Sequence, residues 1–178
     1  MSAPKLRYAA PAVLLHWVLA VALAASFAVG VWMSDLPLSI TRLKLYNWHK
    51  WAGVTILALS LLRLLWRLSH RPPAPLPAPA WQQRAAAATH AAMYLLFFAV
   101  PLLGWAYSSA AGFPVVLFGV LPLPDLVGPD RALAEALKPW HGRAAFALAA
   151  LVLLHVAAVA KHHWVDRDGL LARMRLGR

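Results

Sequence analysis

The sequence predicts an all-α integral membrane protein, organised as a four-helix bundle. Hydrophobic residues make up 62% of its 178 positions and charged residues only 13%, whereas in soluble domains roughly a quarter of all residues are charged. The apolar residues gather in four long runs, and a helix of about 20 residues crosses the hydrocarbon core of a bilayer. Four histidines lie inside these runs, where an ionisable side chain is costly and points to a function.

The apolar runs set the expected helices, and all of them belong to one domain of residues 1–178. Residues 85–124 and 144–160 contain no charged side chain at all. Residues 130–138 have the pattern of a short amphipathic helix before the last span, and the proline-rich segment 71–81 is expected to be extended. We place the membrane spans at residues 12–33, 47–68, 87–108 and 140–163.

Basic residues are distributed unevenly over this topology. The net charge is +11, and the excess lies on one side, which is the positive-inside pattern and predicts that both termini are cytoplasmic. We expect these charges to set topology and to contact the lipid bilayer, with no nucleic-acid partner. Eleven of the 17 basic residues lie on that side: Lys5, Arg7, Arg63, Arg67, Arg71, Arg84, Lys161, Arg167, Arg173, Arg175 and Arg178.

The candidate metal ligands are His16, His49, His141 and His155. His141 and His155 are 14 residues apart on one predicted helix, which is just under four turns, or about 21 Å along the axis. Their side chains therefore point to nearly the same face, one near each side of the bilayer. In an antiparallel bundle, His16 falls at the depth of His155, and His49 falls at the depth of His141.

Two imidazoles that face each other at one depth can bind a flat macrocyclic iron from both sides. Such ligation leaves no open iron position, so it favours electron transfer over oxygen binding. A hydrogen-bonded structural role is the ordinary explanation for one buried histidine, and it is much less favoured for four that pair by depth. Zinc would need three or four ligands at one level. The chain has no cysteine, which excludes iron–sulfur ligation and covalent c-type haem attachment.

Other polar residues near the spans are candidates for secondary contacts. His90, early in the third span, is a candidate for a hydrogen bond to a quinone carbonyl or a haem propionate, with a structural polar contact as the alternative. Arg63, Arg143 and Lys161 are candidate partners of haem propionates, because guanidinium and ammonium groups bind carboxylates. Contact with lipid headgroups is the competing role for these three side chains.

The histidines lie within longer motifs that follow one another along nearly the whole chain. LLHW opens the first span, HKWAG opens the second and LLRLLWRL closes it, and THAAMYLLFFAVPLLGW forms the third. The fourth span and tail read KPWHGRAAFALAALVLLHVAAVAKHHWVDRDGLLARM. In combination these motifs resemble the bacterial cytochrome b561 family, the small four-helix di-haem b cytochromes of the inner membrane.

The resemblance implies two haem b groups and the identity of their ligands. His16 and His155 would be the axial ligands of the inner haem, and His49 and His141 those of the outer haem. It also implies electron transfer between ubiquinone and an outer-face redox partner. One branch of the family oxidises superoxide and reduces ubiquinone, so superoxide is one candidate for the outer-face donor. The expected activity is that of a haem-dependent oxidoreductase, with no catalytic side chain required.

Two other functions fit the same residues. The chain could serve as the cytochrome b subunit of a partner dehydrogenase or hydrogenase. A function of another class is metal transport by the histidines. Visible haem absorption separates transport from the two redox functions, and activity of the single chain with superoxide and quinone separates those two from each other.

Overall fold

The computed structural model describes residues 7–175 of the chain. Four long helices dominate it: α1 (Ala10–Asp35), α2 (Ile40–Ser69), α3 (Ala80–Ala110) and α4 (Arg131–Lys161). Two short strands, β1 (Val116–Leu117) and β2 (Leu121–Pro122), pair antiparallel between α3 and α4. After α4 the chain makes a π-helical turn, η1 (His162–Asp166), and a 3-10 helix, η2 (Leu170–Met174).

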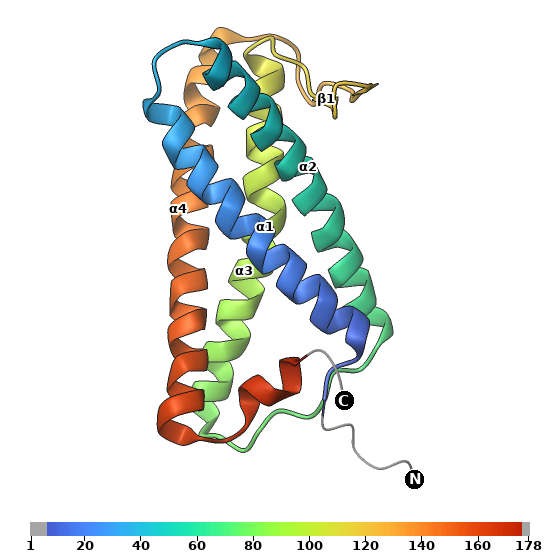
Figure 1. Cartoon of the computed structure of the whole chain (residues 1–178), viewed down its shortest axis with the longest axis vertical. Coiled ribbons are helices and arrows are strands. Elements are labelled where there is room, and N and C mark those ends of the chain that lie inside the picture. Colours follow the sequence, from blue (N-terminus) through green and yellow to red (C-terminus); the bar gives the residue numbers. More distant parts are fainter. Residues whose placement is uncertain (1–6, 176–178) are drawn as a thin grey trace.

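The helices form one antiparallel bundle (Figure 1), in which α1 runs diagonally across the other three. α3 packs along α4, α1 along α2, and α2 along α3. An edge-to-face contact between Phe27 and Phe146, with ring centroids 5.3 Å apart, joins α1 to α4. We call the end that carries the two strands the hairpin end and the opposite end, where residues 7 and 175 lie, the terminal end.

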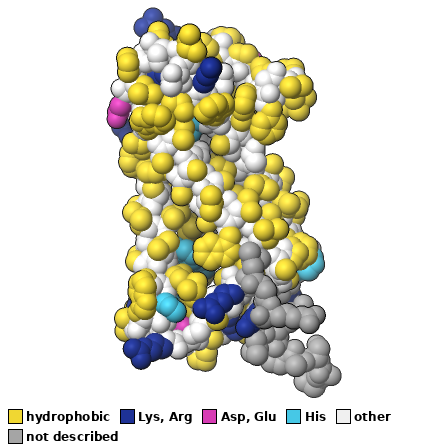
Figure 2. Space-filling view, viewed as in Figure 1, with side chains coloured by type: hydrophobic (Ala, Val, Ile, Leu, Met, Phe, Trp, Pro, Cys, Tyr) yellow, Lys and Arg dark blue, Asp and Glu magenta, His cyan; other side chains and the backbone are white. Residues whose placement is uncertain are grey.

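The surface of the bundle is that of a membrane protein. Each of the four helices is long and apolar enough to cross a bilayer. Large apolar side chains stand exposed at mid-helix, for example Val21, Leu95 and Leu153. Figure 2 shows hydrophobic side chains over the middle of the visible face, with lysine and arginine gathered toward its two ends. Exposed apolar surface of this extent is typical of contact with lipid.

Each predicted span falls on one of the four long helices, with the last two residues of the fourth span in η1, and the helices begin before the spans do. α2 begins at Ile40, because the Ser39 hydroxyl accepts a hydrogen bond from Arg42 N at 3.2 Å and caps the first turn. The apolar run marks only the part of a helix inside the lipid, so hydropathy misses turns that lie in the interface.

The prediction of a separate short helix at residues 130–138 is wrong. Asp130 caps α4 by accepting a hydrogen bond from Leu133 N at 3.0 Å, and the helix then continues unbroken through Pro139. Proline removes one helical hydrogen bond, here the bond to the carbonyl of Glu135, an exposed residue. A single lost bond at this surface bends a helix without ending it.

The short hairpin of β1 and β2 was not predicted. Phe118 and Gly119 both have positive φ, 53° and 75°, and Val120 N donates to Leu117 O at 3.1 Å. Hairpin turns with positive φ at both central residues usually have the sequence Asn-Gly or Asp-Gly. An aromatic residue in the left-handed region is rare, so the sequence carries no turn signal here.

Candidate metal centres

The first histidine pair lies toward the hairpin end. His49 on α2 faces His141 on α4, with ring centroids 6.1 Å apart and ring planes at 86°. Both side chains are half-buried. The pairing that depth alone predicted therefore brings these two rings together across the bundle.

Each ring of this pair is held by the same local construction on a neighbouring helix. His49 Nδ1 lies 3.3 Å from the hydroxyl of Ser26 on α1, and His141 Nδ1 lies 3.0 Å from the carbonyl oxygen of Val100 on α3. One turn after each acceptor comes a glycine, Gly30 after Ser26 and Gly104 after Val100. The absent side chain opens the space that the ring occupies.

The two glycines are required by close approach of the rings. A Cβ on Gly30 would lie 3.0 Å from His49 Cε1, and a Cβ on Gly104 would lie 2.9 Å from His141 Cε1. Both distances are shorter than ordinary van der Waals contact. Gly30 and Gly104 therefore fix where the two imidazoles lie.

These contacts also determine which ring nitrogen is free. A carbonyl oxygen only accepts hydrogen bonds, so His141 donates from Nδ1–H to Val100, and its Nε2 keeps a lone pair. Ser26 can accept from His49 Nδ1–H in the same way. Metal-binding histidines commonly use one nitrogen for the metal and the other for such a partner.

The second histidine group lies toward the terminal end. His16 on α1 and His155 on α4 have ring centroids 6.2 Å apart, with planes at 65°. His90 on α3 lies beside them, 5.5 Å from His155 between centroids. His90 thus lies at this level, in contact with His155.

The two histidine levels are well separated. His141 and His155 are 14 positions apart on α4, about 21 Å at 1.5 Å per residue. This spacing puts one group toward each side of a bilayer about 30 Å thick.

The geometry of each pair fits one metal atom between two imidazoles. Metal–imidazole bonds are about 2.0–2.1 Å long, so a metal bound on both sides holds the two ring centroids roughly 6 Å apart. The measured separations are 6.1 and 6.2 Å. The three rings at the terminal end do not bring their nitrogens within 4.8 Å of one another as a group, which disfavours a zinc site there.

Two buried polar atoms, the hydroxyl of Ser60 and the indole nitrogen of Trp105, have no hydrogen-bond partner among the described residues. Trp105 follows Gly104 on α3, and Ser60 lies one turn before Arg63 on α2. Unpaired buried donors are rare in folded proteins. Polar atoms of a bound group would satisfy them, which fits a cofactor with carboxylate side chains.

The three basic residues predicted as haem-propionate partners have different surroundings in the structure. The guanidinium of Arg63 donates to Ala12 O at 3.3 Å and interacts electrostatically with His16, His90 and His155. Arg143 stacks its guanidinium over Trp140, 5.3 Å from the ring centroid. Lys161 is paired with both carboxylate oxygens of Asp166, at 2.6 and 2.7 Å. Only Arg63 therefore lies beside a histidine group.

A polar network closes the terminal end after α4. The ring of His162 lies 2.5 Å from the carboxylate of Asp168, and Leu170 N donates to the same carboxylate at 3.0 Å. Partial burial acts to raise the pKa of Asp168, but the hydrogen bonds from Leu170 and His162 outweigh it and hold that pKa below its usual range. Asp168 is thus ionised at neutral pH, and this network is lost only as the pH falls through the lowered pKa.

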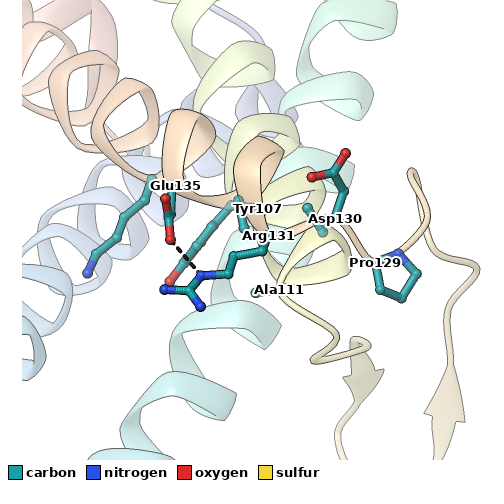
Figure 3. Close-up of a pocket in the computed structure, with 9 residues that line it drawn as sticks. Tyr107, Ala111, Pro129, Asp130, Arg131 and Glu135 are labelled. Carbon is teal, nitrogen blue, oxygen red and sulfur yellow. Dashed lines mark hydrogen bonds and ion pairs between the residues drawn. The ribbon is translucent and has the colours of Figure 1, made fainter.

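A cavity of about 570 Å³ opens at the hairpin end, between the end of α3 and the start of α4. Figure 3 shows Tyr107, Asp130, Arg131 and Glu135 around it, with Arg131 bound to Glu135 at 2.8 Å. Lys138 also lines the cavity, one turn of α4 before His141. The cavity is thus a charged opening on the side of the first histidine pair.

Comparison with known proteins identifies the family of this bundle. The model described as prokaryotic cytochrome b561 matches residues 7–177, nearly the whole chain. The chain belongs to the prokaryotic cytochrome b561 family. Membership makes it a multi-pass membrane protein and implies haem b as its prosthetic group.

This cytochrome b561 chain is similar to named proteins of two bacteria. It is 34% identical to cytochrome b561 homolog 2 of Escherichia coli (strain K12) over 170 residues, which cover 94% of this chain and 90% of the relative. Cytochrome b561 homolog 1 of the same strain is 30% identical, covering 94% of this chain and 96% of the relative. The probable superoxide oxidase CybB of Yersinia pestis is 32% identical over 127 residues, covering 71% of this chain and 72% of the relative.

Sequence reasoning missed the residues that support the histidines. Ser26 and Val100 contact rings on other helices, and one of them acts through a backbone carbonyl, so neither contact has a sequence signature of its own. The signal that could have found them is the glycine four residues later, Gly30 or Gly104, inside an otherwise apolar helix.

Proposed function

We propose that this cytochrome b561 is a di-haem electron-transfer protein that oxidises superoxide at one membrane face and reduces ubiquinone. The observation that carries the proposal is the pair of facing histidines at each of two levels, with centroid separations of 6.1 and 6.2 Å. The likeness to a probable superoxide oxidase supports superoxide as the donor.

The ligand assignment follows from the facing rings. His49 and His141 would hold one haem, each through the nitrogen that is not hydrogen-bonded to protein. His16 and His155 would hold the other haem. When bound, haem b supplies a one-electron carrier on each side of the membrane. The protein would keep both faces of each iron closed to oxygen, because each pair of imidazoles leaves no open position.

Other residues would position the haem edges and the quinone. Arg63 is the best supported propionate partner, since it lies beside the terminal-end rings and its hydrogen bond to Ala12 O engages only one of its guanidinium nitrogens. Trp105 and Ser60 would donate to the polar edge of a haem. His90 would donate to a quinone carbonyl or a propionate next to His155. Arg143 and Lys161 are engaged with Trp140 and Asp166, so they are weaker candidates.

The orientation we propose places the hairpin end outside and both termini in the cytoplasm. Arginines around the loop between α2 and α3 and after α4 give the terminal end most of the positive charge, as the positive-inside rule requires. In this orientation the cavity beside Lys138 opens to the outer face. The lining also contains Asp130, Arg131 and Glu135, and Arg131 is paired with Glu135, so Lys138 is the side chain that would attract an anionic donor such as superoxide.

The overall reaction balances without a catalytic side chain. Oxidation of two superoxide ions to dioxygen releases two electrons, and these two electrons with two protons reduce ubiquinone to ubiquinol. The protein contributes binding, orientation and insulation from water.

The proposal is tested with the purified single chain in lipid nanodiscs. Superoxide should reduce the haem absorption within the mixing time and should drive ubiquinol formation when a short-chain ubiquinone is added. If haem is present but superoxide reduces neither haem nor quinone, the donor is a partner protein and the chain is its cytochrome b subunit. If no haem is bound, metal transport replaces both redox functions.

A further inference from the structure

The hairpin segment, residues 113–123, presents an apolar surface that no part of the described chain covers. Phe118 is 63% exposed and Val120 is 83% exposed, and Phe113 and Leu121 are exposed as well. Figure 1 shows the hairpin standing out beside α2 instead of capping the bundle, and Figure 2 shows hydrophobic side chains at that position. The nearest charged residue along the chain after the segment is Asp125.

Several backbone carbonyls of the hairpin segment accept hydrogen bonds from within the protein. Within the segment, Gly119 N donates to Val116 O at 3.1 Å and Leu123 N donates to Val115 O at 2.9 Å. The Trp51 indole N–H also donates to Val116 O, at 2.6 Å. In water such carbonyls need no protein partner, whereas in lipid an unpaired backbone group is costly.

Two further donors complete this arrangement at the base of the segment. The ammonium of Lys50 donates to Pro114 O at 3.2 Å and to Phe113 O at 3.4 Å. The hydroxyl of Ser108 also donates to Phe113 O. The carbonyls of Phe113 and Pro114 therefore accept hydrogen bonds from side chains of α2 and α3, and the large side chains that the segment exposes are apolar.

The segment is attached at a depth inside the membrane-spanning part of α2. Lys50 and Trp51 directly follow His49, and Trp51 lies 11 residues after the start of the helix at Ile40, about 16 Å along its axis. Phe118 packs on Trp51 with ring centroids 5.7 Å apart. The apolar face of the hairpin is thus continuous with the lipid-facing surface of α2.

We propose that the hairpin segment is a membrane anchor that inserts into the lipid leaflet of the hairpin end, with Phe118, Val120 and Leu121 among the acyl chains and headgroup boundary. Its occupant is lipid, because the surface joins the transmembrane surface, carries no charge, and has the carbonyls of residues 113–117 hydrogen-bonded within the protein, which lowers the cost of lipid contact. The anchor is tied to Lys50 and Trp51, so lipid contact would also brace the turn of α2 that carries His49. The inference does not depend on the electron donor or acceptor.

The test uses the lack of cysteine in the chain. A nitroxide on Val120→Cys, in haem-loaded protein in phosphatidylethanolamine and phosphatidylglycerol nanodiscs, reports collisions with dioxygen, which enters lipid, and with a water-soluble nickel chelate. Val21→Cys on α1, where the side chain is 68% exposed at mid-helix, gives the lipid value. Arg131→Cys, at a side chain 93% exposed at the same end of the bundle, gives the water value.

The expected result is a dioxygen-to-nickel collision ratio at position 120 several-fold above the ratio at position 131. A ratio equal to that at position 131 would overturn the proposal, since the hairpin would then lie in water. A label shielded from both reagents would also overturn it, because protein, such as a second copy of the chain, would then cover the surface. Leu121→Cys serves as the second position, and an unchanged haem spectrum shows that each variant is folded.

Discussion

His155 contacts two other histidines, so it is the residue that most directly tests the ligand assignment at the terminal end. Replacing it by alanine should remove one haem and spare the other, because His49 and His141 lie about four turns of α4 away. Haem content per chain should fall by half, measured by the pyridine haemochrome spectrum. His70→Ala is the matched control, since that exposed ring stacks on Trp66 and belongs to neither group. Retention of both haems in the His155 variant would refute the assignment.

Gly104 tests the construction that holds His141. Alanine there would put a Cβ 2.9 Å from His141 Cε1, and overpacking of this kind typically costs about 1–3 kcal/mol. We expect the ring to move off Val100 and the haem of the hairpin end to be lost or to change its low-spin electron paramagnetic resonance signal. Gly128→Ala, where the new Cβ meets nothing within 4 Å, should leave both signals unchanged. An unaltered spectrum in the Gly104 variant would mean that the close contact does not position the ring.

At the residue scale, the sequence predicted the pairing of the histidines but not their support. Helical periodicity and antiparallel topology are enough to match His16 with His155 and His49 with His141 by depth. The acceptors at Ser26 and Val100 depend on which helices are neighbours and on how they are rotated. Apolar helices in lipid carry little amphipathic pattern to indicate that rotation.

The start of α4 gives a prediction about charge. Lys138 lines the cavity at the hairpin end, and its charge should raise the encounter rate with superoxide. Lys138→Glu should slow superoxide-driven haem reduction several-fold at low ionic strength, and the difference should shrink as salt screens the charge. Arg84→Glu, at the opposite end of the bundle, is the control. Equal rates for the wild type and the Lys138 variant at low salt would show that this charge does not steer the donor.

Element boundaries show where hydropathy stops being informative. The lipid-embedded part of each helix was predictable because its length is set by the bilayer. The first turns of α2 were not, since Ser39 begins them in the interface, where composition is mixed. The first turns of α4 were predicted as a helix, but not as part of the last span. The hairpin was missed because Phe118 takes a conformation that aromatic residues rarely adopt.

For the whole molecule, the four-helix membrane bundle and its family could be predicted from composition, run length and motif order. The contacts that η2 makes with α1 and with the α2–α3 loop at the terminal end could not be predicted from the sequence. Trp17 donates to Met174 O at 2.9 Å and Arg173 donates to Ala74 O at 2.8 Å, so η2 ties the first helix and the α2–α3 loop together. These bonds end on backbone carbonyls far apart in sequence, and no residue pattern reports them.

The orientation of the whole molecule is a separate prediction. A green fluorescent protein fused to the C-terminus should fluoresce, because the positive-inside rule places that end in the cytoplasm. An alkaline phosphatase fused after residue 128, in the loop at the hairpin end, should be active, because this enzyme matures only outside the cytoplasm. The reverse pattern of the two reporters would invert the topology and put the cavity beside Lys138 on the cytoplasmic side.

The central claim is that each histidine pair holds one haem, and haem stoichiometry tests it most directly. The measurement is a pyridine haemochrome spectrum on the detergent-purified chain, with the protein concentration determined by amino-acid analysis. Two b-type haems per chain are the predicted result. One haem would mean that one of the two facing pairs is not a haem site, and no haem would contradict the proposed electron-transfer function as a whole.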